Sequence, residues 1–198
     1  MAETYDVIVI GAGNAGLAAA ATAACELGIN MDDIIEGIAK VEKIEGRMDK
    51  VSEGIYIDYA HTPDAIKKVI ESVKYYNPDK KITVIFGCGG DRDKGKRKKM
   101  GEIASKLSDT VIITSDNSRN EDTFSIIKDI LEGVKKGSLC FIIPNRRDAI
   151  DLGIKLRDKG ILLILGKGHE KYELVKSEKR FFDEKSIVEE ALKYDRSV

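Results

Sequence analysis

Little in this sequence marks a secreted, membrane-bound or nucleic-acid-binding protein. The cysteines Cys25, Cys88 and Cys140 are scattered and odd in number, which argues against a disulfide framework or a metal site. Reduced thiols in a cytoplasmic protein are the simple interpretation. Positive and negative side chains almost cancel, with a formal net charge of −1, so no broad field for nucleic acid or a membrane surface is expected.

Long apolar runs and targeting segments are also missing. The alanine-rich stretch 17–24 is too short to span a bilayer. The N-terminus carries Glu3 and Asp6 and lacks the basic region of a signal peptide. No repeat or low-complexity linker interrupts the chain. Its 198 residues predict one large domain, or a domain with an appendage. A chain of this size buries on the order of 70% of its unfolded surface.

What the sequence does contain is an alternation of apolar, strand-like runs and helical segments joined by short loops. Strands are predicted at 54–59, 82–86, 110–114, 139–143 and 161–165. Helices are predicted to end near Tyr76 and Asp158 and to span about 96–107, 123–135 and 184–194, with a polar hairpin-like stretch before the last one. This alternation predicts an α/β protein with a three-layer, Rossmann-like, mostly parallel sheet and helices on both faces.

Each predicted strand from Ile55 onward ends in a polar cluster. The clusters are DYAHTP at 58–63, GCGGDRDKGKR at 87–97, TSDNSRNED at 114–122, PNRRD at 144–148 and GKGHE at 166–170. The carboxyl ends of parallel strands meet at one edge of a sheet, where α/β proteins bind ligands. Polar loops also arise for solubility alone, but five successive clusters in glycine-rich settings favour a functional edge.

The glycine-rich cluster after the predicted strand 82–86 has two further interpretations. The spacing Gly90-x-x-x-x-Gly95-Lys96 is close to a nucleotide phosphate loop, but Arg97 stands where a magnesium-binding hydroxyl is needed. A basic loop that recognises a carboxylate or phosphate is therefore favoured. The basic side chains of 94–99, Arg97 included, are otherwise typical of a solvated helix face.

The N-terminus has its own motif. A predicted strand, Tyr5–Ile10, leads into Gly11, Gly13 and Gly16 and then a helix, which is the opening of a dinucleotide-binding unit. This opening, about the first twenty residues, resembles that of FAD-dependent flavoproteins. No second strand with a ribose-binding acid follows, because 31–42 has helical spacing. FAD or NAD binding is therefore disfavoured, and a buried strand–helix unit is the simpler interpretation.

A second resemblance covers most of the chain, from about Leu17 to about Leu192. The segments that carry it, in matching order and spacing, are EGR at 45–47, DYAHTPDAI at 58–66, FGCGGDRDKGKR at 86–97, SDNSR at 115–119 and GKGHE at 166–170. Together they resemble the C-terminal domain of the Mur ligases, in the form of the members that add diaminopimelate. The resemblance divides the chain into an opening with a linking helix at 1–45 and an amino-acid-binding, Rossmann-like domain at 46–198.

The resemblance implies binding roles and no catalytic residue or metal ligand in this chain. Arg47, Asp58 and His61 are expected to face ATP. The residues expected to bind the incoming amino acid are Arg92, Asn117, Arg119, Gly166 and Glu170. On meso-diaminopimelate, Arg119 suits the distal carboxylate and Glu170 the distal ammonium. Each charge-assisted bond is worth roughly 1.5–3 kcal/mol.

The resemblance also implies a reaction, the ATP- and Mg-dependent addition of meso-diaminopimelate to UDP-MurNAc-L-Ala-D-Glu in peptidoglycan synthesis. The sequence shows no counterpart of the family's ATPase and UDP-sugar domains, so no ligase turnover is expected from this chain alone. Ser118 and Asn145 replace the family's usual Pro and Asp. A FAD or NAD module and an inactive fused or designed scaffold stay open as alternatives, as does the oligomeric state.

Overall fold

The computed structural model describes residues 14–40 and 44–195 of the chain. The chain divides into two compact units, Met1–Ile44 and Glu45–Val198. The predicted strand Tyr5–Ile10, with Gly11 and Gly13, lies outside the described residues. Gly16 lies near the start of the first helix, α1 (Asn14–Glu26).

The first unit contains a helical hairpin. After α1, Asn30 caps α2 (Met31–Ala39), and its side chain accepts a hydrogen bond from the Asp33 backbone N–H at 2.9 Å. Among the described side chains of this unit, Ile34 is buried, whereas Met31 and Ile35 are exposed. The helical spacing predicted for 31–42 is therefore confirmed over Met31–Ala39.

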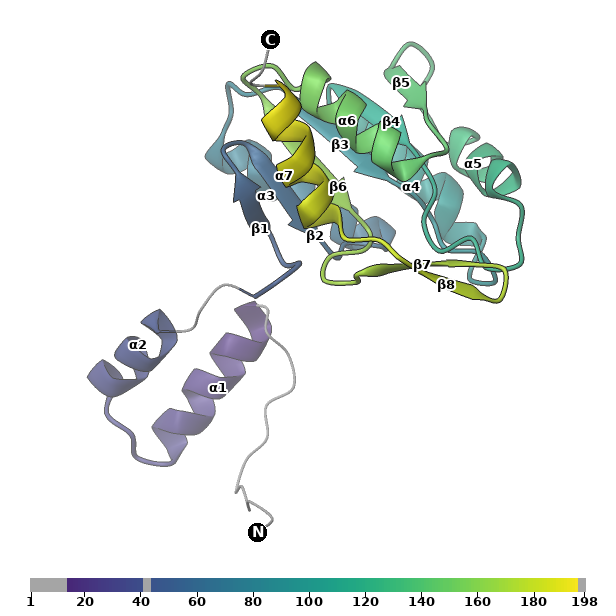
Figure 1. The fold of residues 1–198 in the computed structure, drawn as a ribbon. Helices are drawn as coiled ribbons and strands as arrows, with labels where there is room; N and C mark the ends of the chain where they lie inside the picture. The colour runs from purple at the N-terminus through teal and green to yellow at the C-terminus, as the bar shows by residue number, and fades with distance from the viewer. Residues whose placement is uncertain (1–13, 41–43, 196–198) are drawn as a thin grey trace. The chain divides into compact units, whose positions relative to one another are not determined.

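The second unit is built on a six-stranded sheet with the spatial order β1-β2-β6-β3-β4-β5 (Figure 1). The strands are β1 (Asp49–Ser52), β2 (Ile55–Asp58), β3 (Ile82–Phe86), β4 (Thr110–Ile113), β5 (Leu139–Ile142) and β6 (Ile161–Leu165). All neighbouring pairs are parallel except β1 with β2. The predicted α/β class with a mostly parallel sheet is confirmed.

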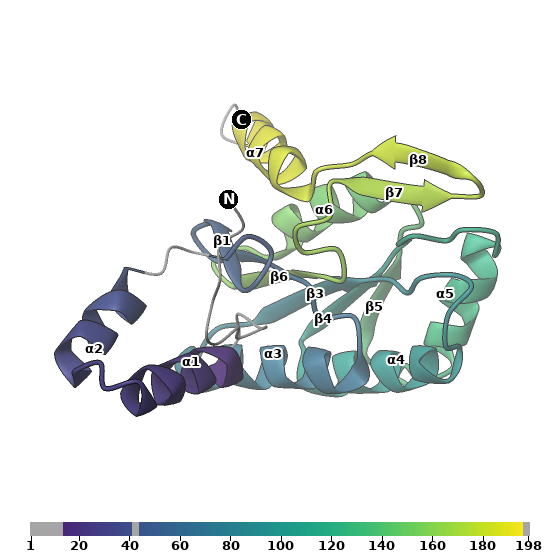
Figure 2. The same ribbon diagram turned by 90° about the horizontal axis from the view of Figure 1, so that it is seen from below.

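Helices cover both faces of this sheet (Figure 2). One face carries α3 (Pro63–Tyr76), α4 (Gly95–Leu107) and α5 (Thr123–Leu131), and the other carries α6 (Arg146–Leu156) and α7 (Glu184–Asp195). Each face has its own apolar core, with Ile70 and Met100 fully or almost fully buried in the first and Ile150 and Val188 in the second. The strands β3 and β6 are buried along their whole length, as expected for central strands covered on both sides.

Capping residues set where the helices of this unit begin. Thr62 accepts from the Ala65 N–H before α3, with Pro63 at the first helical position. Asp122 caps α5 by accepting from the Ser125 N–H at 2.8 Å. Asn145, the residue that departs from the family pattern, caps α6 by accepting from the Arg147 and Asp148 N–H groups. It therefore retains the capping function open to an Asp at this position.

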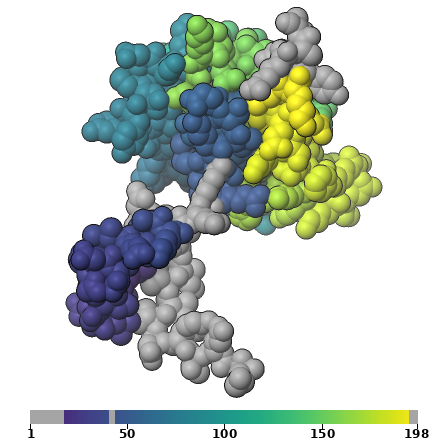
Figure 3. Space-filling view, turned by 60° about the vertical axis from the view of Figure 1, so that its left-hand side comes forward, coloured from purple at the N-terminus to yellow at the C-terminus, as the bar shows by residue number. Residues whose placement is uncertain are grey.

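The ends of two predicted helices need correction, and one strand was not predicted. The edge strand β1 was not predicted, because Asp49–Ser52 is mostly polar; α7 packs beside it, as Figure 3 shows. The helix α5 ends at Leu131 and not near 135, because the chain turns at Gly133, where an added Cβ would lie 1.8 Å from the Lys98 carbonyl oxygen. The helix predicted to end near Asp158 stops at Leu156, and Asp158 has a positive φ of 49°. The hairpin-like stretch forms β7 (Tyr172–Val175) and β8 (Glu178–Phe181).

Candidate functional site

The site is defined by the topology of the sheet. The chain passes from β2 to β3 through α3 on one face and returns from β5 to β6 through α6 on the other, which inserts β6 between β2 and β3. The loops that follow β2, β6 and β4 therefore converge at the carboxyl edge of the sheet, at a topological switch point. Ligands of open α/β sheets bind at such points.

A hydrogen-bonded group joins these three loops. The Asn117 side chain, from the loop after β4, donates to Glu170 Oε2 at 2.9 Å. The Tyr59 hydroxyl, from the loop after β2, donates to Glu170 Oε1 at 3.3 Å. Both donors are neutral, and within the described residues Glu170 forms no ion pair. The Glu170 carboxylate is therefore held in one orientation, and no cationic side chain among the described residues pairs with it.

Arg119 lies beside this group and is tied down through its backbone. Its φ is 51°, in the left-handed region, and its N–H donates to the Leu174 carbonyl of β7 at 2.9 Å. Its Nη1 donates to the carbonyl oxygens of Gly90 at 2.9 Å and Asn117 at 3.2 Å. Among the residues that the structure describes, the guanidinium forms no ion pair, so its remaining N–H groups suit a carboxylate.

The loop after β3 supports Arg119. An added Cβ at Gly90 would lie 1.9 Å from the Ser118 carbonyl oxygen, so the two loops can meet only at a glycine. Gly89 lies between Arg119 Nη1 and the Arg92 side chain, at 2.9 and 3.9 Å from its added Cβ. Arg92 itself is exposed, and its Nη1 donates to the Asp91 carbonyl at 3.4 Å. The structure thus brings Arg92 and Arg119 to one side of the carboxyl edge.

Arg97 corrects the prediction of a solvated face over 94–99. Its side chain is fully buried and forms ion pairs with Glu121 and Asp129, each at 2.9 Å. The hydrogen bond from Arg97 to Glu121, with a further bond from the Asp91 N–H, lowers the pKa of Glu121 to about 2. Arg97 therefore stabilises the loop, and it does not present a charge to a ligand.

A buried cluster of charges lies beneath the site. Arg146 pairs with Glu184 at 2.6 Å and donates to the carbonyl oxygens of Ser115 and Leu165. Burial raises the pKa of Glu184, and the neighbouring Arg146 only partly opposes this. Burial also acts to raise the pKa of Asp116, but Arg146 and Lys167 outweigh it and hold that pKa below its ordinary value.

Gly166, at the end of β6, is placed where no side chain fits. Its φ is 120°, and an added Cβ would lie 2.8 Å from Asp116 Oδ2. The following residue, Lys167, is fully buried, and its ammonium donates to Asn117 Oδ1 at 3.0 Å and to the Tyr172 carbonyl at 2.7 Å. The loop after β6 thus binds the loop after β4 from below, and Gly166 is buried there, with its N–H donating to the Asp58 carbonyl at 3.0 Å.

A second group, of rings and one cation, gathers around Tyr59 in the loop after β2, with Arg47 from the turn before β1 and His169 from the loop after β6. The Arg47 guanidinium lies 5.1 Å from the centre of the Tyr59 ring. The rings of His61 and His169 lie 4.7 and 5.3 Å from the same ring. Arg47, His61 and His169 are exposed, so this group can contact a ligand with an aromatic or anionic part.

Asp58 plays a different part from the exposed members of that group. Its side chain is buried, and its carboxylate accepts from the backbone N–H groups of Met48 and Ala60, each at 2.8 Å. These bonds hold the turn that carries Arg47 against the end of β2. The structure therefore brings Arg47 and His61 to the surface and leaves Asp58 beneath them.

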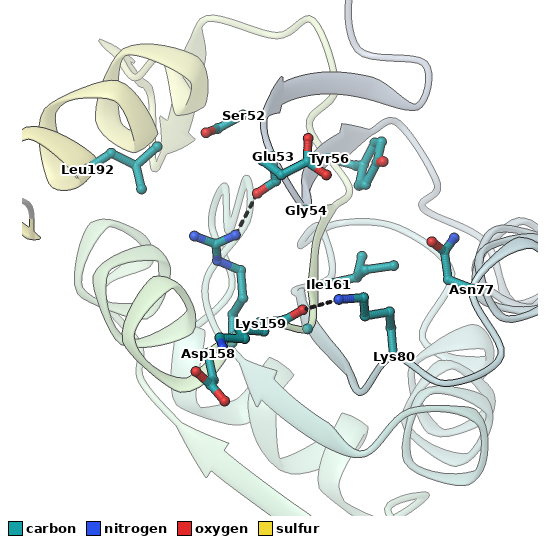
Figure 4. Close-up of a pocket in the computed structure, with 12 residues that line it drawn as sticks. Ser52, Glu53, Gly54, Tyr56, Asn77, Lys80, Asp158, Lys159, Ile161 and Leu192 are labelled. Carbon is teal, nitrogen blue, oxygen red and sulfur yellow. Dashed lines mark hydrogen bonds between the residues drawn. The ribbon is translucent and has the colours of Figure 1, made fainter.

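The opposite edge of the sheet holds a cavity of about 470 Å³ (Figure 4). Three cationic residues line it, Lys80, Arg157 and Lys159. Two of their side chains donate to backbone carbonyls of turns: Arg157 Nη1 to Glu53 at 2.5 Å and Lys80 Nζ to Lys159 at 3.1 Å. The cavity contains none of the residues predicted to bind a ligand.

Metal and membrane sites find no support in the described part of the chain. No group of three or more His, Cys, Asp or Glu side chains there could hold a metal ion. Over the same residues, no helix is long and apolar enough to cross a bilayer. Cys88 is buried, and burial raises the pKa of its thiol to about 12, which leaves it protonated.

Sequence reasoning missed four members of the site: Tyr59, Asp116, Lys167 and His169. All four lie inside motifs that were recognised, and Tyr59, Lys167 and His169 stand between residues that were assigned. A usable signal was present, since a lysine directly after an apolar central strand must either reach solvent or find buried acceptors. The contact between Lys167 and Asn117 forms because the loops after β6 and β4 lie close together in the folded sheet. The sequence does not reveal that these two loops meet.

Comparison with known proteins identifies relatives of this arrangement. Residues 46–168 match the family model of the Mur ligase, glutamate ligase domain. The UDP-N-acetylmuramoyl-L-alanyl-D-glutamate–2,6-diaminopimelate ligase of Rickettsia rickettsii is 43% identical over 170 residues, which cover 84% of this chain and 35% of the relative. Ligase 1 of the same name from Clostridium acetobutylicum is 40% identical over 199 residues, covering 96% of this chain and 41% of the relative.

A solved structure gives the same result in three dimensions. A UDP-N-acetylmuramoyl-L-alanyl-D-glutamate–2,6-diaminopimelate ligase superimposes with a TM-score of 0.71 at 34% identity, over 91% of this chain and 38% of that one. The chain thus spans between about a third and two fifths of the length of these relatives. Because the Clostridium match covers 96% of the chain, it extends into the first unit as well.

Proposed function

Since this chain belongs to the Mur ligase family, we propose that it is the amino-acid-binding part of a ligase that adds meso-diaminopimelate to UDP-N-acetylmuramoyl-L-alanyl-D-glutamate. The ligases to which it is similar carry this activity in their names. In the complete reaction, ATP activates the carboxylate of the nucleotide peptide and the amine of diaminopimelate attacks it. This chain contributes by orienting that amine.

One observation carries the proposal: Arg119 and Glu170 have opposite charges, both contact Asn117, and neither forms an ion pair within the described residues. Such a pair complements the carboxylate and ammonium of an amino acid. Arg119 would bind the distal carboxylate and Glu170 the distal ammonium of meso-diaminopimelate. Arg92 would add positive charge beside Arg119, Asn117 would contribute a neutral amide between Arg119 and Glu170, and Gly166 would let the loop after β6 approach Asp116 closely.

ATP would lie on the group formed by Arg47, Tyr59, His61 and His169. Rings of this kind suit a purine or ribose, and the guanidinium of Arg47 suits a phosphate. Asp58 would support this contact from below through its bonds to the Met48 and Ala60 N–H groups. The described residues offer no cluster for Mg, so the metal would be held by another part of the ligase. A cytoplasmic location follows from the same proposal.

Calorimetric titration of the purified chain with meso-diaminopimelate tests this function, with L-lysine as the control ligand. Binding of diaminopimelate alone, lost in Arg119→Ala, is the expected result. Arg180→Ala, on the exposed strand β8, should leave binding unchanged. Equal binding of both ligands, or a full affinity in Arg119→Ala, would contradict the proposed site.

Catalysis and cofactor use can be tested separately. We expect no ATP-dependent tripeptide formation by this chain alone, and measurable turnover would contradict this expectation. Binding of FAD or NAD at Gly11, Gly13 and Gly16 remains a disfavoured alternative, and no observation in the described residues supports it. A purified protein that is yellow and retains flavin absorbance would favour dinucleotide binding over the proposed amino-acid-binding function.

A further inference from the structure

We propose that Lys167 is a positioning residue that fixes, through the side-chain amide of Asn117, the orientation of the Glu170 carboxylate. This inference rests on the proposed function, in which Glu170 binds the ammonium of the incoming amino acid. Lys167 itself does not bind that ligand, because its side chain is fully buried.

The ammonium of Lys167 is held by acceptors from two segments, β7 and the loop after β4. It donates to the Tyr172 carbonyl of β7 at 2.7 Å and to Asn117 Oδ1 at 3.0 Å. It also lies 3.7 Å from Asp116 Oδ1. A buried charge is tolerated only when its hydrogen bonds are satisfied, so these acceptors and the ammonium stabilise one another.

Lys167 and the Leu174 N–H together determine which way the Asn117 amide points. Asn117 Oδ1 accepts from Lys167 Nζ and from the Leu174 N–H, at 3.0 and 2.9 Å. An ammonium and a backbone N–H can only donate, so the amide nitrogen cannot occupy that position. It must point to the other side, where it donates to Glu170 Oε2 at 2.9 Å.

The series of contacts that starts at Lys167 ends at the Glu170 carboxylate, which is the group proposed to bind the ammonium. Glu170 is fixed by two neutral donors, the Asn117 amide and the Tyr59 hydroxyl. Without the Lys167 ammonium, only the Leu174 N–H fixes the amide, so the amide spends less time in the orientation that donates to Glu170. Loss of Lys167 should therefore weaken ammonium binding without removing a single atom that contacts the ligand.

The first test is calorimetry with meso-diaminopimelate on Lys167→Met, which keeps the side-chain length and removes the charge. We expect about tenfold weaker binding, the worth of one hydrogen bond to a charged group. Lys171→Met is the matched control, since Lys171 lies in the same loop but pairs with Glu45 at the surface. In a Glu170→Gln background the Lys167→Met effect should largely disappear. A tenfold effect that persists in that background would overturn the inference.

The second test needs no ligand, and it separates this inference from the proposed function. NMR spectra of the ligand-free protein report the Asn117 side-chain amide and the Glu170 carboxyl carbon. Both resonances should move in Lys167→Met, and neither should move in Lys171→Met. Movement of both in a protein that binds no diaminopimelate would reject the function but retain the positioning role. If neither moves, the inference is wrong. Lys167→Leu, which also removes the donor, replaces Lys167→Met in both tests should that variant not fold.

Discussion

The two edges of the same sheet differ in the charged side chains that they hold in place: the carboxyl edge orients a cation and a carboxylate, and the amino edge orients two cations. At the carboxyl edge, Arg119 and Glu170 are held by neutral groups and form no ion pair within the described residues. At the amino edge, Arg157 and Lys80 donate to the carbonyl oxygens of turns around the cavity of about 470 Å³. The large cavity therefore lies at the edge whose two cations are bound to turn carbonyls, whereas the edge that orients a cation and a carboxylate around Asn117 is the better candidate for binding an amino acid.

The carboxyl edge also separates two kinds of arginine. Arg97 and Arg146 are fully buried, and both are paired with carboxylates. Arg119 and Arg92 are more accessible and have no carboxylate partner among the residues described. An arginine that is paired with a carboxylate has a structural role here, whereas an arginine without such a partner is available to bind a ligand. Its position in a motif alone does not separate the two roles.

The largest effect should come from the buried pair beneath the carboxyl edge. Arg146→Met leaves Glu184 buried without its partner, and breaking such a pair costs about 3–5 kcal/mol of unfolding free energy. Arg147→Met, next to it in sequence, removes an exposed pair with Glu190 and should cost at most about 1 kcal/mol. Urea denaturation measures both, and similar losses in the two variants would remove the distinction between buried and exposed arginines.

A smaller effect, on binding alone, is expected at the uncompensated carboxylate. Glu170→Gln keeps the size of the side chain and removes its charge, so meso-diaminopimelate should bind roughly ten- to a hundredfold more weakly. Calorimetry gives this ratio. The matched control is Glu178→Gln, whose exposed carboxylate pairs with Arg180 on β8. Unchanged affinity in Glu170→Gln would show that the carboxylate does not meet the ligand.

Acid should reveal the pairing of Arg97 with Glu121. The pKa of Glu121 is lowered from its ordinary value of 4.5 to about 2, so its contribution to stability is complete above pH 4.5. That contribution is lost as the pH falls from 4.5 to about 2. Glu121→Gln should therefore flatten the loss of stability across this range, as measured by urea denaturation at several pH values. The control is Glu132→Gln, which changes an exposed carboxylate. Its stability should depend on pH in the same way as that of the wild-type protein.

The smallest effect belongs to the amino edge. Arg157→Gln removes the hydrogen bond to the Glu53 carbonyl and should cost about 0.5–1.5 kcal/mol of unfolding free energy. It should leave the affinity for meso-diaminopimelate unchanged, because the side chain lies at the other end of the strands. A loss of affinity in Arg157→Gln as large as that in Arg119→Ala would contradict the conclusion that only the carboxyl edge binds the ligand.

Much of the fold follows from the sequence, because the buried strands are continuous apolar runs and the helices begin at capping residues such as Thr62 and Asp122. The edge strand β1 does not, since a polar strand has no periodic signal and forms only by pairing with β2. The motifs likewise indicated Arg119 and Glu170 as binding residues. The burial of Arg97 and the contact of Lys167 with Asn117 could not be predicted, since both depend on elements distant in sequence.

The hydrogen bonds between Arg119 and β7 have a consequence for the lifetime of the site. The Arg119 N–H donates to the Leu174 carbonyl, and the Lys176 N–H donates to the Arg119 carbonyl at 2.6 Å. An isolated two-stranded hairpin is marginally stable in water, so β7 and β8 are expected to open locally before the sheet unfolds. Each opening releases the backbone of Arg119. Hydrogen exchange at the Arg119 and Lys176 amides would therefore share one rate, that of the hairpin, and this rate limits how long the carboxylate-binding geometry persists.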